Sequence, residues 1–152
     1  MAYFSLEMAM RAADIGTSRV VQLNESSTIC EAARTMRQHD VGCVVTMKNT
    51  LAGMLPSGVV TDRDLTIRFL ANDIGQEKTL RDIQSTPLVT CHADTTIDEI
   101  IGMMLGSDVR RMPIVDDQDQ LIGIVSLDDV MAALAELMQR VSCALTGSRE
   151  LD

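Results

Sequence analysis

The chain has 152 residues, of which 46% are hydrophobic and 23% charged, and its formal net charge is −9 at pH 7. This composition is too apolar for a disordered chain, and the length allows one domain or two small halves that share a core. The negative charge disfavours nucleic-acid binding, and an aromatic content of 2% leaves few side chains on which bases could stack.

The predicted elements occur twice in the same order: strand, helix, strand, turn, strand and helix. The strands are short runs rich in β-branched or other apolar residues, at 20–23, 41–47 and 58–60 and again at 88–91, 112–115 and 123–125. The first helix of each unit starts at a capping box, Thr28 with Glu31 and Thr96 with Glu99, and continues with apolar residues at helical spacing. The final helices begin at Asp62 and Leu127.

The two units align residue by residue. An offset of 68 places Asp14 on Asp82, and an offset of 65 places Gly58 on Gly123, because the loop at 48–57 is longer than its counterpart at 116–120. The resulting boundaries are an N-terminal helical extension at 1–13, repeat 1 at 14–72, a linker at 73–81, repeat 2 at 82–140, and a helix end and tail at 141–152. Neither small sheet can bury both of its faces alone, so we expect the repeats to pack together as one α/β body.

Both repeats close on the pattern Gly, two hydrophobic residues, Thr or Ser, two further residues and Asp, at 58–64 and 123–129. Repeat 2 also contains Asp-Val-Arg-Arg-Met-Pro-Ile-Val-Asp at 108–116. With both patterns at this spacing, residues 12–140 resemble a tandem pair of the cystathionine-β-synthase (CBS) domain family. The resemblance implies an α/β (α+β) fold of two β-α-β-β-α repeats with pseudo-two-fold symmetry, and two clefts between them.

The resemblance also implies a function and its ligands. Many members of this family bind AMP, ADP, ATP, NAD(H) or S-adenosylmethionine in the clefts and regulate an attached or partner protein. We therefore expect a regulatory module with no obligatory cofactor and an effector protein of unknown identity. The alternative is a structural dimerisation module without a nucleotide ligand. An independent enzyme is disfavoured, because the sequence has no nucleophile elbow, no phosphate-binding glycine loop and no catalytic residues that we can assign.

The closing motif of each repeat supplies candidate ribose ligands. Thr61 and Asp64 in repeat 1, and Ser126 and Asp129 in repeat 2, have the spacing of a helix cap, which is also their simplest structural explanation. At a helix start that opens into a cleft, the carboxylate can also accept hydrogen bonds from both hydroxyls of a ribose.

Arginines near the motifs are candidate phosphate ligands. Arg110 and Arg111 could clamp a phosphate, because guanidinium groups match its oxygens, whereas repeat 1 has Gly42 and Cys43 at the equivalent positions. Solvent exposure is the alternative for this pair, and a surface salt bridge is the alternative for Arg63, the third candidate. We expect the cleft of Ser126 and Asp129 to contain Arg110 and Arg111 and to bind phosphorylated adenosine more tightly than the cleft of Thr61 and Asp64.

The resemblance implies that the base rests against the segment entering the first strand and the start of the second strand of the other repeat. These positions are Thr17, Val21, Val41 and Gly42 in repeat 1, and Ser85, Val89 and Val109 in repeat 2. Packing in the core is the alternative for the valines.

Helical character continues from Leu127 to about Leu145. Apolar residues in this stretch follow the 4-3-4-3-4 spacing of a short heptad seam: Leu127, Met131, Leu134, Met138, Val141 and Leu145. A stripe this broad favours a second subunit, so we expect a homodimer built through the helices after Thr61 and Ser126. Leu6 and Met10 suggest a short N-terminal helix that could cover the same region.

The four cysteines lack metal-ligand spacing and lie in apolar surroundings: Cys30, Cys43, Cys91 and Cys143. We therefore expect reduced cysteines and no metal site, as in a cytoplasmic protein. The N-terminus lacks a basic region followed by an apolar run, which predicts no signal peptide. The longest clearly apolar stretch, 130–135, is too short to span a membrane.

Overall fold

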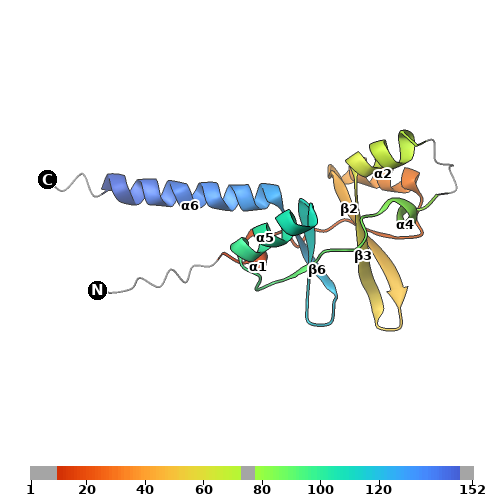
Figure 1. The fold of residues 1–152 in the computed structure, drawn as a ribbon, viewed down its shortest axis with the longest axis horizontal. Coiled ribbons are helices and arrows are strands. Elements are labelled where there is room, and N and C mark those ends of the chain that lie inside the picture. Colours follow the sequence, from red (N-terminus) through yellow and green to blue (C-terminus); the bar gives the residue numbers. More distant parts are fainter. Residues whose placement is uncertain (1–9, 73–77, 148–152) are drawn as a thin grey trace.

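The computed structural model describes residues 10–72 and 78–147, so most of the predicted N-terminal extension lies outside the described residues. Two similar halves lie side by side, and a long C-terminal helix projects from the second (Figure 1). The first half comprises α1 (Ala12–Ile15), β1 (Gln22–Asn24), α2 (Ile29–His39), β2 (Cys43–Thr50), β3 (Gly53–Thr61), α3 (Asp62–Asp64) and the π-helical η1 (Leu65–Leu70). The second comprises α4 (Leu80–Ile83), β4 (Cys91–His92), α5 (Ile97–Ser107), β5 (Arg111–Val115), β6 (Leu121–Ser126) and α6 (Leu127–Gly147).

Each half contains a three-stranded sheet with the same topology. The first strand runs parallel to the second, which forms an antiparallel hairpin with the third, in the orders β1-β2-β3 and β4-β5-β6. The hairpin register shifts after Thr46 in one sheet and after Ile114 in the other, positions that the offset of 68 makes equivalent. The predicted repeat is therefore a structural one down to its irregularities.

The predicted helix starts are confirmed. The Thr28 and Thr96 hydroxyls accept hydrogen bonds from the third residue of α2 and α5, at 3.1 and 3.4 Å, and Thr96 completes a reciprocal capping box with Glu99. Both helices end at an aspartate in the left-handed conformation, Asp40 with φ 52° and Asp108 with φ 53°. The final helices begin at Asp62 and Leu127, as predicted.

The first strand of each half is shorter than its sequence pattern suggests. Strands were expected at 20–23 and 88–91, but pairing is confined to Gln22–Asn24 and Cys91–His92. The chain just before each strand crosses between the halves, and Val20 and Leu88 pack there in a shared core instead of extending the sheet. The β-branched composition reflects this burial as much as strand pairing.

The short helices α1 and α4 are exchanged between the halves, which local sequence patterns do not predict. Ala12 of α1 is buried in the core of the second half, and its amide donates a 2.8 Å hydrogen bond to the carbonyl of Thr95. Leu80 of α4 is buried in the core of the first half, and its amide donates a 3.0 Å bond to the carbonyl of Ser27. This reciprocal exchange is what a two-fold relation between the halves requires.

A third core cluster joins the two halves. Val45, Met47 and Val59 of the first sheet pack with Leu121 and Ile124 of the second. Each sheet thus covers one face with its own helices and the other with its neighbour, which confirms the predicted single α/β body. Over the described residues, none of the helices combines the length and apolar composition needed to cross a membrane.

Candidate functional site

A cavity of about 490 Å³ lies between the two halves. Three segments far apart in sequence line it: the end of β3 with α3 and η1, the crossing segment before β4, and the turn that leads into β5. Its lining contains eight of the predicted site residues: Thr61, Arg63, Asp64, Ser85, Val89, Val109, Arg110 and Arg111. The other predicted site residues are absent from this lining: Thr17, Val21, Val41, Gly42, Ser126 and Asp129.

The predicted grouping of the arginines is wrong. Arg110 and Arg111 line the cavity that contains Thr61 and Asp64, and not one with Ser126 and Asp129. Arg111 pairs with Ser126 through the backbone of β5 and β6, but its guanidinium extends toward the first half. A methyl group built on Gly42 would lie 3.9 Å from Nη2 of Arg111, so the two residues face each other across the halves.

Helix capping positions Asp64 at the cavity wall. Asp64 Oδ2 accepts hydrogen bonds from the Thr61 amide at 2.9 Å and the Thr61 hydroxyl at 2.7 Å, and the same hydroxyl accepts from the Asp64 amide at 3.2 Å. Asp64 is only 15% exposed. The structural explanation of this motif is therefore correct, and it holds the carboxylate in one orientation.

Arg68 is a cavity residue that the sequence patterns did not single out. Its Nε lies 3.1 Å from Asp64 Oδ1, and its Nη1 donates to the carbonyls of Ile83 at 2.9 Å and Gln84 at 3.2 Å. Arg68 therefore ties the motif of the first half to the exchanged helix α4. The i, i+4 spacing of Asp64 and Arg68 was the available signal, but this spacing is also common on exposed helix faces.

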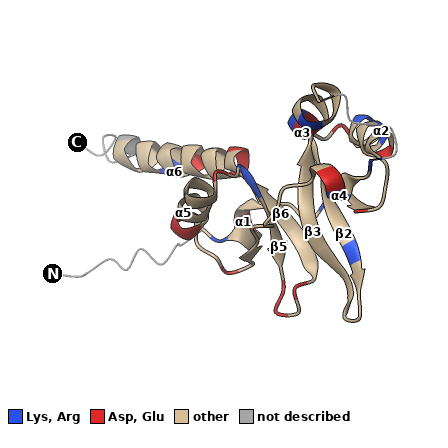
Figure 2. Cartoon of the chain, turned by 45° about the vertical axis from the view of Figure 1, so that its right-hand side comes forward, with Lys and Arg blue, Asp and Glu red and all other residues tan. Residues whose placement is uncertain are grey.

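The cavity is basic in an acidic protein. Its lining includes four of the chain's thirteen Lys and Arg residues, together with three aspartates. Arg68 is paired, but across the described residues neither Arg63, Arg110 nor Arg111 forms an ion pair. Figure 2 shows basic positions on α3 and at the start of β5, on either side of the junction between the halves. Three guanidinium groups are thus available to an anion.

The equivalent positions of the other repeat carry no arginine. The offsets of 65 and 68 match Arg63 and Arg68 with Asp128 and Ala133, and Arg110 and Arg111 with Gly42 and Cys43. Ser126 and Asp129 reproduce the cap, with Asp129 Oδ2 accepting at 2.7 Å from the Ser126 amide and at 2.6 Å from its hydroxyl. The two motifs therefore share their backbone geometry and differ in charge.

The remaining predicted base-binding residues have structural surroundings of their own. Val21 and Val41 pack against the core of the first half, and the backbone of Thr17 pairs with Ile124.

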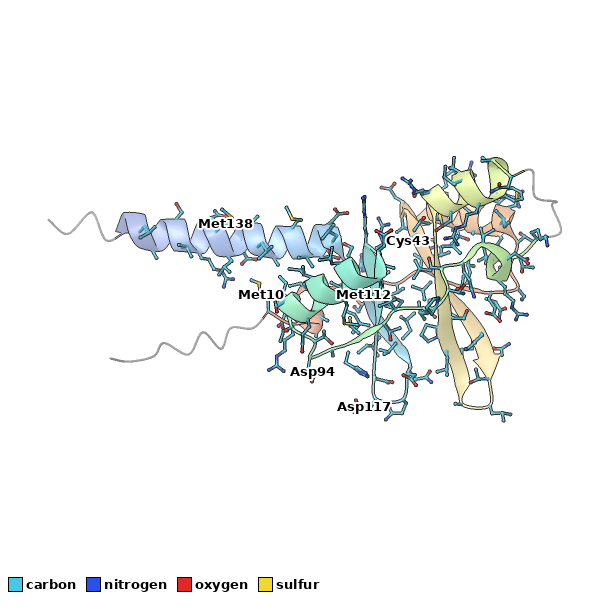
Figure 3. The ribbon with its side chains drawn as sticks, in the orientation of Figure 1. Met10, Cys43, Asp94, Met112, Asp117 and Met138 are labelled. Carbon is cyan, nitrogen blue, oxygen red and sulfur yellow. The ribbon has the colours of Figure 1, made fainter. Side chains whose placement is uncertain are left out.

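Cys43 follows Gly42 and lies at the start of β2 (Figure 3). Burial raises the pKa of the Cys43 thiol, while the charge of Arg111 opposes this effect. Within residues 10–72 and 78–147 there is no cluster of three or more metal-ligating side chains.

Comparison with known proteins agrees with the repeat. The sequence model of the CBS domain family matches residues 12–70 and 80–136 of this chain. The CBS domain-containing protein YhcV of Bacillus subtilis is 36% identical over 77% of this chain and 80% of its own length. The uncharacterized protein MK0525 of Methanopyrus kandleri is 33% identical over 80% of this chain, and the match spans only 63% of that protein.

A solved structure shares the fold. The CBS domain pair of protein MJ0100, crystallised with 5-methylthioadenosine and S-adenosyl-L-methionine, superposes with a TM-score of 0.73 over 84% of this chain and 98% of that one, at 23% identity. Together with the two matched segments and the exchanged helices, this likeness accounts for the whole body of the molecule. The chain belongs to the CBS domain family, and its two halves form a tandem CBS pair.

Proposed function

We propose that the chain is a regulatory module that binds a phosphorylated adenosine-containing ligand in the cavity next to Asp64 and signals its presence to a partner protein. One observation carries the proposal. The cavity next to Asp64 contains four arginines, whereas the equivalent positions of the other repeat contain none. Three of the four make no ion pair within the described residues. Several guanidinium groups that lie close together and have no ion-pair partner repel one another and match the oxygens of a phosphate, so this arrangement favours an anionic ligand.

The rest of the cavity suits a nucleoside. The Asp64 carboxylate only accepts hydrogen bonds, so it can bind a ribose hydroxyl. Because Thr61 and Arg68 already hold the carboxylate in place, binding costs little side-chain entropy. Val59, Leu88, Val89 and Val109 give the cavity an apolar wall for a base. A volume of about 490 Å³ lies within the range of small-molecule sites.

Charge separates the candidate ligands. S-adenosylmethionine, which is bound by the CBS pair of MJ0100, carries a positive sulfonium group that three neighbouring guanidinium groups would repel. AMP, ADP, ATP and NAD(H) carry phosphate groups that match the same guanidinium groups. We therefore infer phosphate-bearing nucleotides as the ligand class, in preference to S-adenosylmethionine.

The two capping motifs provide a matched experiment. AMP and adenosine are titrated calorimetrically into the wild type, Asp64→Asn and Asp129→Asn. Asparagine retains an oxygen for the cap but loses the charge, so Asp64→Asn should weaken AMP binding by roughly 10- to 100-fold, the value of a hydrogen bond to a charged group. Asp129→Asn makes the same change at a motif without arginines and should leave this binding within about twofold.

Arg110→Ala tests the contribution of the phosphate to binding separately from that of the nucleoside. It should weaken AMP binding and leave adenosine binding nearly unchanged, because only AMP carries the phosphate. Raising the salt concentration should likewise weaken AMP binding more than adenosine binding. Equal losses in Asp64→Asn and Asp129→Asn would contradict the assignment of the cavity. No heat with any of AMP, ADP, ATP, NAD(H) and S-adenosylmethionine would favour a structural dimerisation module instead.

A further inference from the structure

A buried glutamine lies between α4 and the first sheet. Gln84 directly follows α4 and is only 7% exposed. Its side chain covers Gly58 of β3 so closely that a methyl group on this glycine would lie 2.8 Å from the glutamine carbons. The Thr46 hydroxyl donates a 2.5 Å hydrogen bond to Gln84 Oε1, and the Ser57 hydroxyl lies 3.5 Å from the same oxygen. These contacts hold the glutamine in one position against the sheet.

The second half is packed differently at the equivalent positions. The offset of 68 matches Gln84 with Gly16 and Thr46 with Ile114. A methyl group on Gly16 would lie 2.7 Å from Cδ1 of Ile114. In the second half an apolar side chain of the sheet therefore occupies the space that the first half fills with a polar side chain from the end of α4. Gly16 has no side chain that could hold the end of α1 away from its sheet.

The backbone next to these residues is also paired differently. In the second half Thr17 and Ile124 exchange two backbone hydrogen bonds of 2.9 Å. Ser85 and Val59 are the equivalent pair in the first half, where the Ser85 amide donates to the Val59 carbonyl at 3.0 Å. Among the described residues, the return bond from the Val59 amide to the Ser85 carbonyl is not formed. The segment that crosses between the halves before β4 is thus only half paired with β3.

This incomplete pairing lies at the wall of the cavity. Ser85 and Val59 both line the cavity, whereas Gln84 is absent from its lining. The Gln84 carbonyl accepts a 3.2 Å hydrogen bond from Arg68, the cavity residue that pairs with Asp64. If the crossing segment moved toward β3, both the cavity wall and the anchor of Arg68 would therefore shift.

We propose that Gln84 is a positioning residue of the ligand cavity. Its side chain is a spacer that keeps the crossing segment before β4 away from β3, so that the cavity stays open and Arg68 and Ser85 stay in place for the ligand. Because protein interiors are closely packed, the backbone moves inward where a spacer is missing, as it does beside Gly16. The role in ligand binding rests on the proposed function, whereas the role as a spacer concerns the ligand-free protein.

Exchanging the packing pair between the halves tests the spacer. Thr46→Ile combined with Gln84→Gly gives the first half the residues of the second, and Gln84→Met keeps a side chain of similar length. Hydrogen exchange of single amides is followed by NMR in the ligand-free protein. In the wild type the Val59 amide should exchange at least about tenfold faster than the paired Ile124 amide. The double variant should slow exchange at Val59 at least about tenfold, and Gln84→Met should leave it within about threefold. A loss of stability alone would accelerate exchange.

Calorimetric titration with AMP measures the consequence for the ligand. The double variant should bind AMP at least about tenfold more weakly than the wild type, and Gln84→Met should bind it within about threefold. Circular dichroism verifies folding, and Gln84→Ala, which also removes the spacer, replaces the double variant if that chain does not fold.

The proposal is overturned if the spacer-free variant leaves either Val59 exchange or AMP binding within about threefold of the wild type, or if Gln84→Met behaves like that variant. A wild type that binds no AMP would count against the proposed function alone, because the exchange rates still decide whether Gln84 is a spacer.

Discussion

Leu80→Ala tests whether α4 belongs to the core of the first half. Leu80 precedes repeat 2 in the sequence, and the predicted linker ended one residue after it. In the structure its side chain is 0% exposed and packs with Ile29, Ala32 and Val60 of the first half. If the exchange of helices is correct, truncating this side chain opens a cavity in a core formed largely by residues of repeat 1.

The expected loss follows from burial. Leucine-to-alanine substitutions at fully buried positions cost about 2–5 kcal/mol, and a site as enclosed as that of Leu80 belongs near the middle of this range, about 3 kcal/mol. For a chain of this size each kcal/mol lowers Tm by about 2–4 °C, so the expected fall is roughly 6–12 °C. Leu70→Ala is the matched control, because the same atoms are removed from a side chain that is 70% exposed. It should stay within about 0.5 kcal/mol of the wild type.

Urea unfolding followed by far-ultraviolet circular dichroism measures both variants, since the chain contains no tryptophan to serve as a fluorescence probe. The urea midpoint should fall for Leu80→Ala with an unchanged slope, because the two halves share a core and unfold together. A destabilisation below about 1 kcal/mol, or one equal to that of Leu70→Ala, would refute the placement of α4.

Two further predictions concern ionisable groups. Burial raises the pKa of Glu25, but hydrogen bonds and the charge of Arg81 outweigh this effect and hold the pKa below its ordinary value. As the pH falls, Glu25 is therefore protonated first in the unfolded chain and only at lower pH in the folded protein. The stability that the Glu25 carboxylate contributes is fully present above its ordinary pKa and is lost as the pH falls through the lowered pKa of the folded protein. Glu25→Gln should reduce stability at neutral pH and flatten the decline of the urea midpoint on acidification; an undiminished decline would contradict this role. Burial raises the pKa of the Cys91 thiol to about 11, so a maleimide at mildly alkaline pH should modify exposed Cys30 at least tenfold faster than Cys91. Mass spectrometry of the labelled peptides checks this ratio, and equal rates would contradict the burial of Cys91.

Local sequence patterns were sufficient for the order of the main elements of this protein, but not for the bounds of β1, β3 and β4 or for the short helix α4. Helix starts could be predicted at Thr28 and Thr96 because a cap depends on residues three positions apart, and the continuation of α6 past residue 140 could be predicted because its apolar spacing is helical. The duplication was visible because both copies keep the same residues at turns and caps. These features depend on residues that are close together along the chain, so they can be recognised in the sequence itself.

The tertiary structure alone decided which residues meet. Arg111 is paired with Ser126 in the hairpin of β5 and β6, and the carbonyl of Arg110 accepts a hydrogen bond from the Leu127 amide, yet both arginines line the cavity with Thr61 and Asp64. The exchange of α1 and α4 and the role of Arg68 depend in the same way on how the halves dock. Docking is driven by burial of apolar surface, which has no direction along the chain and leaves no local signature. For this reason the candidate residues could be predicted one by one, whereas their assembly into a single basic cavity could not.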